Sequence, residues 1–205
     1  WNGSIEACKM QGYFLNDKKL FINSISNTSL SDADFIKFEE KYSDCIKNLV
    51  IEISEREEPD SECMDRKFAF AKRWNVEIAI DDFGSGYNTE TVLLHISPNF
   101  VKIDVALVRD IDKDIERQNL LSNMIKFIKA RNAKIIAEGV ETKEEMFTMI
   151  RLGIDYVQGY YLGKPEFDIK EIPIERKNEL IEFNKSKISP LRYIRYNDKT
   201  NAGGA

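Results

Sequence analysis

The sequence predicts an α/β protein built on parallel strands. Six short runs rich in Ile, Val, Phe and Tyr alternate along the chain with segments of helical period. The connection between successive runs is long enough to contain a helix, which is what parallel strands need. The pattern therefore favours a parallel sheet, either closed as a barrel or open. The length of 205 residues fits one domain or two small ones.

The six expected strands share their composition. β-branched and aromatic residues dominate each of them. They are residues 19–24 (KLFINS), 48–53 (NLVIEI), 76–81 (VEIAID), 100–103 (FVKI), 134–137 (KIIA) and 155–162 (DYVQGYYL). No glycine-rich turn follows the first strand, so a dinucleotide-binding unit has little support.

Segments between the strands have the periodicity of amphipathic helices. In residues 31–48 the apolar stripe consists of Phe35, Phe38, Tyr42 and Ile46. In residues 60–74 it consists of Met64, Phe68 and Ala71, and in residues 114–131 of Leu121, Met124, Ile125 and Ile128. A further helix is expected to begin after Thr142, because Thr142 and Glu145 have the spacing of a capping box.

The charge balance excludes several classes of partner. Thirty basic residues against 35 acidic ones give a net charge of −5, so we expect no duplex nucleic acid as a partner. The sequence has no apolar run near the length of a membrane span and no signal-peptide pattern at its start. We expect the chain to be cytoplasmic, or to be the cytosolic part of a larger, membrane-anchored protein, with no membrane contact from this segment.

The metal-binding residue types are unevenly represented. Three cysteines, none at C-x-x-C spacing, and a single histidine cannot build a disulfide framework or a conventional zinc site. Any metal would have to be held by oxygen ligands, which favours Mg²⁺, Mn²⁺ or Ca²⁺.

A polar residue lies at or near the end of each expected strand. In chain order these are Asn23, Glu52, Asp81, Lys102, Glu138 and Gln158, at intervals of 29, 29, 21, 36 and 20 residues. Each interval has about the size of one strand–helix unit, so a parallel fold brings the six side chains to the same edge of the sheet. Clustered carboxylates repel one another unless a cation compensates them. The pattern thus resembles a metal-assisted hydrolysis site.

Two adjacent acidic residues raise a question of geometry. Asp81 and Asp82 would point to opposite faces of a regular strand. Both reach one site only if the strand ends there, as the glycine-containing turn at Gly84, Ser85 and Gly86 suggests.

Several motifs in the chain match a known family. They are IDDFGSGYNTETVLLHISPNFVKID, IIAEGVET and YVQGYYLGKP, with FINSISNTSLSD and IEISE upstream of them. In these motifs the chain resembles the EAL-domain phosphodiesterases, which hydrolyse cyclic di-GMP. The resemblance runs from about residue 4 to residue 166.

The resemblance implies a fold, a reaction and a set of residue roles. The fold would be a variant of the TIM-type (β/α)8 barrel. The reaction would open cyclic di-GMP to linear pGpG with two Mg²⁺ or Mn²⁺ ions, in a protein that forms a homodimer. The metal ligands would be Asn23, Glu52, Asp81, Asp82, Glu138 and, through water, Gln158. The residues taking part in catalysis would be Lys102, Glu138 and Asp82. Support for the site, its loop and the substrate would come from Glu55, Gly84, Ser85, Gly86, Tyr87, Asp104 and Glu141.

One part of the family pattern is missing from the sequence. The Glu-Ala-Leu tripeptide belongs on the first strand of the family, upstream of the position that matches Asn23. Only 22 residues precede Asn23, and none of them fits this tripeptide. We therefore expect a barrel without its first strand and part of its first helix. Residues 1–185 would form this incomplete domain, and residues 186–205 would form a tail or linker.

The missing strand leaves two explanations open. The chain is either a trimmed piece of a complete enzyme or a truncated, non-catalytic relative that binds cyclic di-GMP as a sensor or interaction module. A third interpretation, taken from the residues alone, is a barrel enzyme of another kind, such as a proton-abstracting lyase. The motifs disfavour it.

Overall fold

A computed structural model gives the structure of the chain. It describes residues 1–16, 18–24, 28–54, 61–84, 93–94, 96–166, 168 and 170–187. The chain divides into two compact units, Trp1–Lys170 and Glu171–Ala205. The described part of the second unit contains one helix, α8 (Ile174–Lys187). Within the described ranges, no helix is long and apolar enough to cross a membrane.

The first unit is organised around a six-stranded parallel sheet. Its strands are β1 (Leu20–Ser24), β2 (Leu49–Ser54), β3 (Glu77–Phe83), β4 (Phe100–Ile103), β5 (Lys134–Ala137) and β6 (Tyr156–Val157). Each strand pairs with its neighbour in sequence, so the order is β1-β2-β3-β4-β5-β6. A doubly wound open sheet reverses its strand order at a switch point, whereas a barrel does not. The structure thus confirms the predicted α/β fold of barrel type.

The last strand is much shorter than predicted. Only Tyr156 and Val157 pair with β5, although the sequence suggested a strand over residues 155–162. The chain turns immediately afterwards, because the backbone of Val140 binds this segment on both sides. Its N–H donates to the carbonyl of Gln158 at 3.1 Å, and its carbonyl accepts from the N–H of Tyr161 at 3.0 Å. The prediction was wrong because the aromatic residues of this tight turn give it the same composition as a strand.

Helices and short 3-10 turns precede the first strand and connect the others. They are α1 (Asn2–Met10), η1 (Tyr13–Asn16), α2 (Asp32–Tyr42), η2 (Ile46–Asn48), α3 (Ser61–Trp74), α5 (Val105–Val108), η3 (Ile111–Lys113), α6 (Ile115–Lys129) and α7 (Lys143–Leu152). Side-chain oxygens of Ser31, Asp114 and Thr142 cap the starts of α2, α6 and α7. The capping box of α7 is present as predicted.

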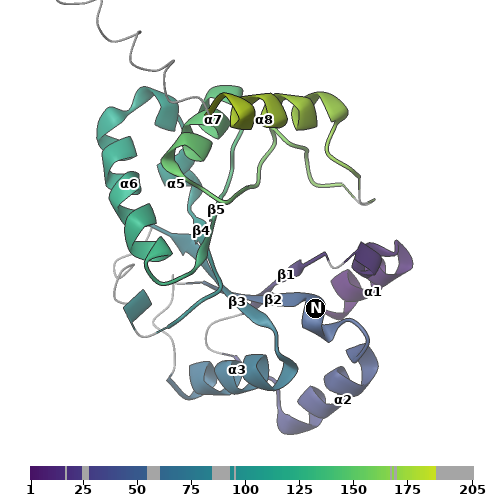
Figure 1. The fold of residues 1–205 in the computed structure, drawn as a ribbon. Coiled ribbons are helices and arrows are strands. Elements are labelled where there is room, and N and C mark those ends of the chain that lie inside the picture. The colour runs from purple at the N-terminus through teal and green to yellow at the C-terminus, as the bar shows by residue number, and fades with distance from the viewer. Residues whose placement is uncertain are drawn as a thin grey trace, which may run out of the picture. The chain divides into compact units, whose positions relative to one another are not determined.

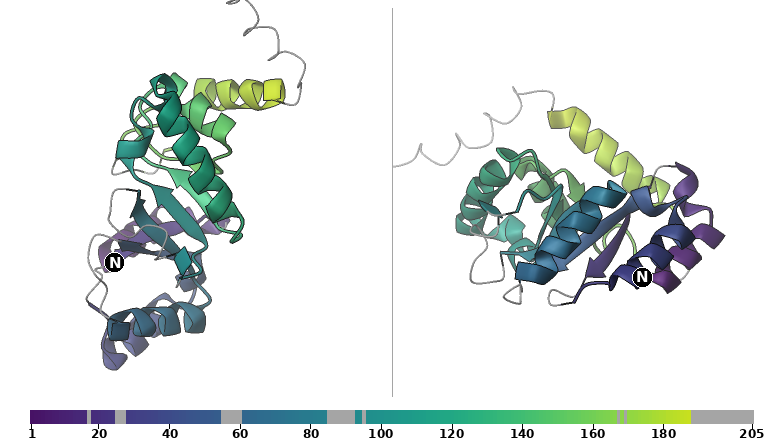
Figure 2. Two further views of the ribbon diagram at one scale, coloured as in Figure 1. Left: turned by 90° about the vertical axis from the view of Figure 1, so that its left-hand side faces the viewer. Right: turned by 90° about the horizontal axis from the view of Figure 1, so that it is seen from below.

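The helices bury their apolar stripes against the sheet. Figure 1 shows α2 and α3 beside the first strands and α6 and α7 beside β4 and β5, and Figure 2 shows the same arrangement from two further sides. Phe35 and Trp74 stack with their ring centroids 4.5 Å apart and join α2 to α3. Ile22, Ile51 and Ile135 are buried on the strands.

The alternation of side chains along each strand explains where the polar residues lie. Val50, Ala79, Phe100 and Ile136 form one buried apolar cluster, against which Phe21 packs. Successive residues of a strand point to opposite faces, so residues two positions later share a face. Two positions further on, the residues are Asn23, Glu52, Asp81, Lys102 and Glu138. The apolar cluster therefore forms the floor beneath the polar strand ends.

Candidate metal centre at the carboxyl ends of the strands

Lys102 lies at the centre of the polar strand ends. Its Nζ atom is 2.6 Å from Glu52 Oε1, 2.7 Å from Asp81 Oδ1 and 2.8 Å from Glu138 Oε1. These four residues come from β2, β3, β4 and the position directly after β5, so the neighbouring strand ends meet as the sequence predicted. The lysine side chain is only 7% exposed. The three ion pairs are therefore shielded from water, and the electrostatic attraction within each pair is stronger than in a pair on the surface.

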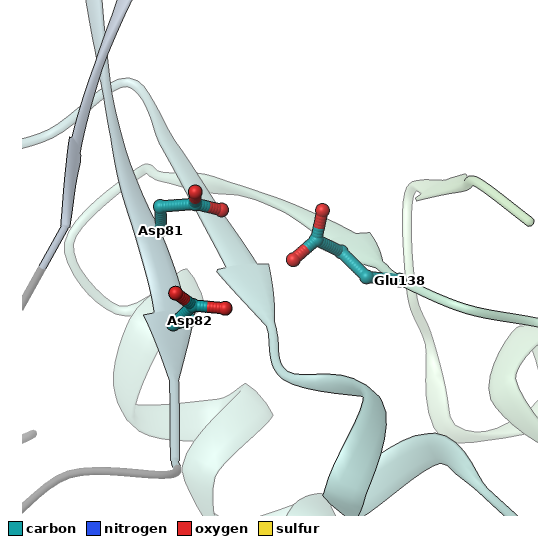
Figure 3. Close-up of side chains that lie close together, drawn as sticks. All are labelled: Asp81, Asp82 and Glu138. Carbon is teal, nitrogen blue, oxygen red and sulfur yellow. The ribbon is translucent and has the colours of Figure 1, made fainter. Parts of the chain in front are cut away.

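A group of three carboxylates in this site could hold a metal ion. Asp81, Asp82 and Glu138 each place one carboxylate oxygen within 4.8 Å of the others. Figure 3 shows the three side chains facing a common space from β3 and from the segment after β5. Carboxylate oxygens are the ligands that Mg²⁺, Mn²⁺ and Ca²⁺ prefer. The residues of this chain thus fit a hard divalent cation.

A bulge explains how Asp81 and Asp82 reach the same space. The strand does not end at these residues, because β3 continues to Phe83. Instead, the pairing with β4 shifts register between Ile80 and Phe83. Asp82 has a positive φ of 57°, a left-handed conformation that Asp tolerates better than most residues. The extra residue and this backbone turn rotate Asp82 to the side of Asp81.

The charges of the site are unbalanced. Three carboxylates, those of Glu52, Asp81 and Glu138, contact one ammonium group, and the Asp82 carboxylate lies close to two of them. Burial raises the pKa values of Glu52 and Glu138, and Lys102 opposes this effect only in part. Burial alone would lower the pKa of Lys102, but the three bound carboxylates outweigh it and raise that pKa. Lys102 therefore stays charged, and the site keeps an excess of negative charge that attracts cations.

The structure places the two predicted amide ligands at the exposed rim. Asn23 lies opposite Glu52 in the register of β1 and β2, and its backbone carbonyl accepts from the indole N–H of Trp1 at 2.7 Å. Gln158 follows β6, and its backbone N–H donates to the carbonyl of Ala137 at 2.8 Å. Both residues are exposed.

The predicted supporting residues have separate surroundings. Gly84 has a φ of +104°, and a Cβ atom there would lie 2.3 Å from Cδ1 of Leu107, so this turn packs directly on α5. Asp104 is buried and caps α5 by accepting from the N–H of Ala106 at 2.7 Å. Glu55, Ser85, Gly86 and Tyr87 lie outside the described residues.

Sequence reasoning missed the surroundings of Glu141. Its carboxylate forms a two-pronged ion pair with the guanidinium of Arg109, at 2.7 and 2.5 Å. Glu145, predicted only as a helix-capping residue, also accepts from the backbone N–H of Glu141 at 2.8 Å. No signal in the sequence could identify these contacts, because Arg109 lies 32 residues before its partner.

The geometry first defines a class of protein. A parallel barrel-type sheet with a carboxylate-rich, lysine-containing cluster at the carboxyl ends of its strands is an α/β domain of the kind that hosts metal-assisted chemistry. The sequence model of the EAL domain matches residues 5–165. The chain therefore belongs to the EAL domain family, as its motifs indicated.

Curated relatives have names that agree with this assignment. The "Probable cyclic di-GMP phosphodiesterase PdeG" of Escherichia coli K12 is 34% identical over 119 residues, which are 58% of this chain and 24% of that protein. The "Cyclic di-GMP phosphodiesterase PdeL" of the same strain is 33% identical over 121 residues, which are 57% of this chain and 33% of that protein. The match thus spans a third or less of the length of these relatives.

Solved structures share the fold. A standalone EAL protein from Vibrio cholerae O395 in its c-di-GMP-bound form has a TM-score of 0.74 at 30% identity, over 84% of this chain and 74% of that one. The manganese/cyclic-di-GMP complex of Klebsiella pneumoniae BlrP1 has a TM-score of 0.70 at 25% identity, over 78% of this chain and 41% of that one.

Proposed function

We propose that this chain is the catalytic part of a metal-dependent phosphodiesterase that hydrolyses cyclic di-GMP to linear pGpG. The observation that carries the proposal is the convergence of Asp81, Asp82 and Glu138 within 4.8 Å beside the buried Lys102. Relatives named cyclic di-GMP phosphodiesterases and a neighbour solved with manganese and cyclic di-GMP support the substrate and the type of metal.

The proposed metal ligands lie at or near the carboxyl ends of the strands. Asp81, Asp82 and Glu138 would hold two Mg²⁺ or Mn²⁺ ions, together with Glu52, the side-chain oxygen of Asn23 and, through water, Gln158. Bound there, the cations would supply Lewis-acid activation of water and neutralise charge on the phosphodiester.

The chain's own groups would direct the reaction. Asp82, at the rim of the site, would accept a hydrogen bond from the attacking water and orient it toward phosphorus. Lys102 would exchange one of the three carboxylates that its ammonium binds for a phosphate oxygen or for that water, and would donate to it. The water oxygen would form a bond to phosphorus while one phosphorus–oxygen bond to ribose breaks, and the proton that the water loses would end on the ribose oxygen that leaves. Homodimer formation and a cytoplasmic location belong to the same proposal.

Product analysis tests the proposal. The protein is incubated with cyclic di-GMP and Mn²⁺ or Mg²⁺, and the nucleotides are separated by chromatography. We expect pGpG to form, and EDTA to stop its formation. Glu138→Ala should lower turnover by about a hundredfold or more, with an unchanged circular dichroism spectrum. Glu144→Ala, which removes an exposed carboxylate from the first turn of α7, is the matched control and should keep wild-type turnover.

The sensor alternative gives a different result in the same protein. A sensor would bind cyclic di-GMP in a calorimeter without added metal, would tolerate Asp81→Asn, and would release no pGpG. Ligand binding without product would contradict the proposed hydrolysis.

A further inference from the structure

Glu145 has contacts that its role as a helix cap does not require. It lies in the first turn of α7 and is 1% exposed. A buried carboxylate is costly unless strong donors compensate it. Three backbone N–H groups donate to it, those of Asp110, Glu141 and Thr142. The capping box accounts only for the contact with Thr142.

The two carboxylate oxygens of Glu145 accept hydrogen bonds from two different segments. Oε1 accepts from the N–H of Asp110 at 2.9 Å, in the segment after β4. Oε2 accepts from Glu141 at 2.8 Å and from Thr142 at 3.1 Å, in the segment after β5. Asp110 has a left-handed backbone with φ 54°. The carboxylate thus joins two loops that are separate in the sequence.

Each of the two loops contributes one partner to the same ion pair. Asp110 directly follows Arg109, whose guanidinium binds the Glu141 carboxylate at both oxygens. The carbonyl of Arg109 is also fixed, because it accepts from Arg117 at 2.6 Å. Glu145 therefore binds the backbone of Asp110, next to Arg109, and the backbone of Glu141 itself.

The segment between Glu138 and Glu141 can transmit a displacement to the site. The N–H of Glu138 donates to the carbonyl of Ile103 at 3.2 Å. At Gly139, which has φ +66°, a Cβ atom would lie 2.4 Å from Cγ2 of Val105. Val140 is fully buried. The short, packed connection leaves little freedom between Glu138 and the point that Glu145 holds.

We propose that Glu145 is a positioning residue of the candidate metal centre, which joins the loops after β4 and β5 and so fixes Glu138 through Glu141. The proposal rests on the proposed function for its substrate. Groups that orient metal ligands from outside the coordination shell typically change metal affinity or activity by about 10- to 100-fold when they are removed.

The experiment compares three variants in the protein that contains residues 1–205. Glu145→Ala removes all three contacts. Thr142→Ala removes the other half of the capping box, where the Thr142 hydroxyl accepts from the N–H of Glu145, and is the matched control for helix stability. Glu145→Gln keeps the size of the side chain but has one acceptor oxygen, so it can satisfy one loop and not both. The measurements are Mn²⁺ affinity by calorimetry without nucleotide, hydrogen exchange at residues 109–110 and 138–142, and kcat/KM for cyclic di-GMP.

We expect Glu145→Ala to weaken Mn²⁺ binding by about tenfold, to lower kcat/KM by at least as much and to speed exchange at both loops. Thr142→Ala should stay within about twofold of wild type, and Glu145→Gln should fall between them. Equal Mn²⁺ affinity in Glu145→Ala and Thr142→Ala would overturn the proposal, even with an active wild type. Weakened Mn²⁺ binding in Glu145→Ala alone, with a wild type that binds Mn²⁺ but forms no pGpG, would support it and contradict the phosphodiesterase.

Discussion

At the scale of single residues, Lys102 joins the carboxylates of the site. Its ammonium lies within 2.8 Å of three carboxylates that would otherwise repel one another. The sequence predicted Lys102 and these carboxylates at one sheet edge, because the spacing of strand ends is readable from the chain. The contacts between Lys102 and the three carboxylates could not be predicted, because they depend on how side chains from four strands are oriented in space.

The first prediction concerns Lys102→Met. We expect it to lower the free energy of unfolding in EDTA by about 3 kcal/mol, because it leaves buried carboxylates without a partner. The control is Lys134→Met, which removes an exposed lysine whose ammonium lies 5.7 Å from the centre of the Phe100 ring. This control variant should lose no more than about 1 kcal/mol of its free energy of unfolding. Urea denaturation at neutral pH measures both, and equal losses would contradict the role given to Lys102.

The second prediction concerns the backbone of Asp82. Asp82→Asn and Asp82→Ala both remove the charge, but Asn adopts a left-handed conformation more readily than Ala. At φ 57°, we expect the Ala variant to be about 1 kcal/mol less stable than the Asn variant. Thermal or urea unfolding in EDTA measures the difference. An Ala variant as stable as the Asn variant would argue against the bulge at this position.

At the scale of elements, the loops after the strands are held by close contacts between backbones. The sequence predicted the helices α2, α3, α6 and α7 and five of the six strands closely, because apolar periodicity fixes them locally. It could not predict how Gly159 approaches Val140, since that contact joins segments with no shared pattern. The sixth strand was predicted too long for the same reason, because the contact with Val140 that ends it cannot be predicted from local sequence.

The third prediction concerns Gly159→Ala. A Cβ atom at this position would lie 2.1 Å from the carbonyl oxygen of Val140 and 2.3 Å from its nitrogen. Backbone atoms cannot move aside cheaply, so we expect a loss of about 3 kcal/mol of stability. Gly163→Ala is the control, because a Cβ atom there meets nothing within 4 Å. It should stay within about 0.5 kcal/mol of wild type, and similar losses in both variants would contradict the packing.

The fourth prediction concerns pH and Glu145. Burial alone would raise the pKa of Glu145, but its three backbone donors outweigh burial and hold the pKa below the usual 4.5. A carboxylate with a lowered folded-state pKa contributes its stability above the unfolded value and loses it as the pH falls through the folded value. Wild type should therefore be more stable than Glu145→Gln at about pH 7, and the difference should shrink toward about pH 3.

Urea denaturation across this pH range, with EDTA present, measures the difference in stability. A difference that stays constant from neutral to acidic pH would show that the Glu145 carboxylate is not stabilised in its ionised form.

At the scale of the whole molecule, the described sheet ends at β1 and at β6. A barrel closes by pairing such edges, and an unpaired edge invites association with other strands. The sequence predicted a sheet of barrel type from the family motifs. It also predicted where the site would lie, because the carboxyl ends of parallel strands meet at one edge. All described metal-ligand candidates lie within the unit Trp1–Lys170.

The central claim is that the strand ends of this unit form one metal centre. Diffraction from crystals grown with Mn²⁺, recorded near the manganese absorption edge, tests it most directly. We expect anomalous density within about 2.5 Å of the carboxylate oxygens of Asp81, Asp82 and Glu138. Crystals that contain Mn²⁺ but show no anomalous density at these carboxylates would contradict it.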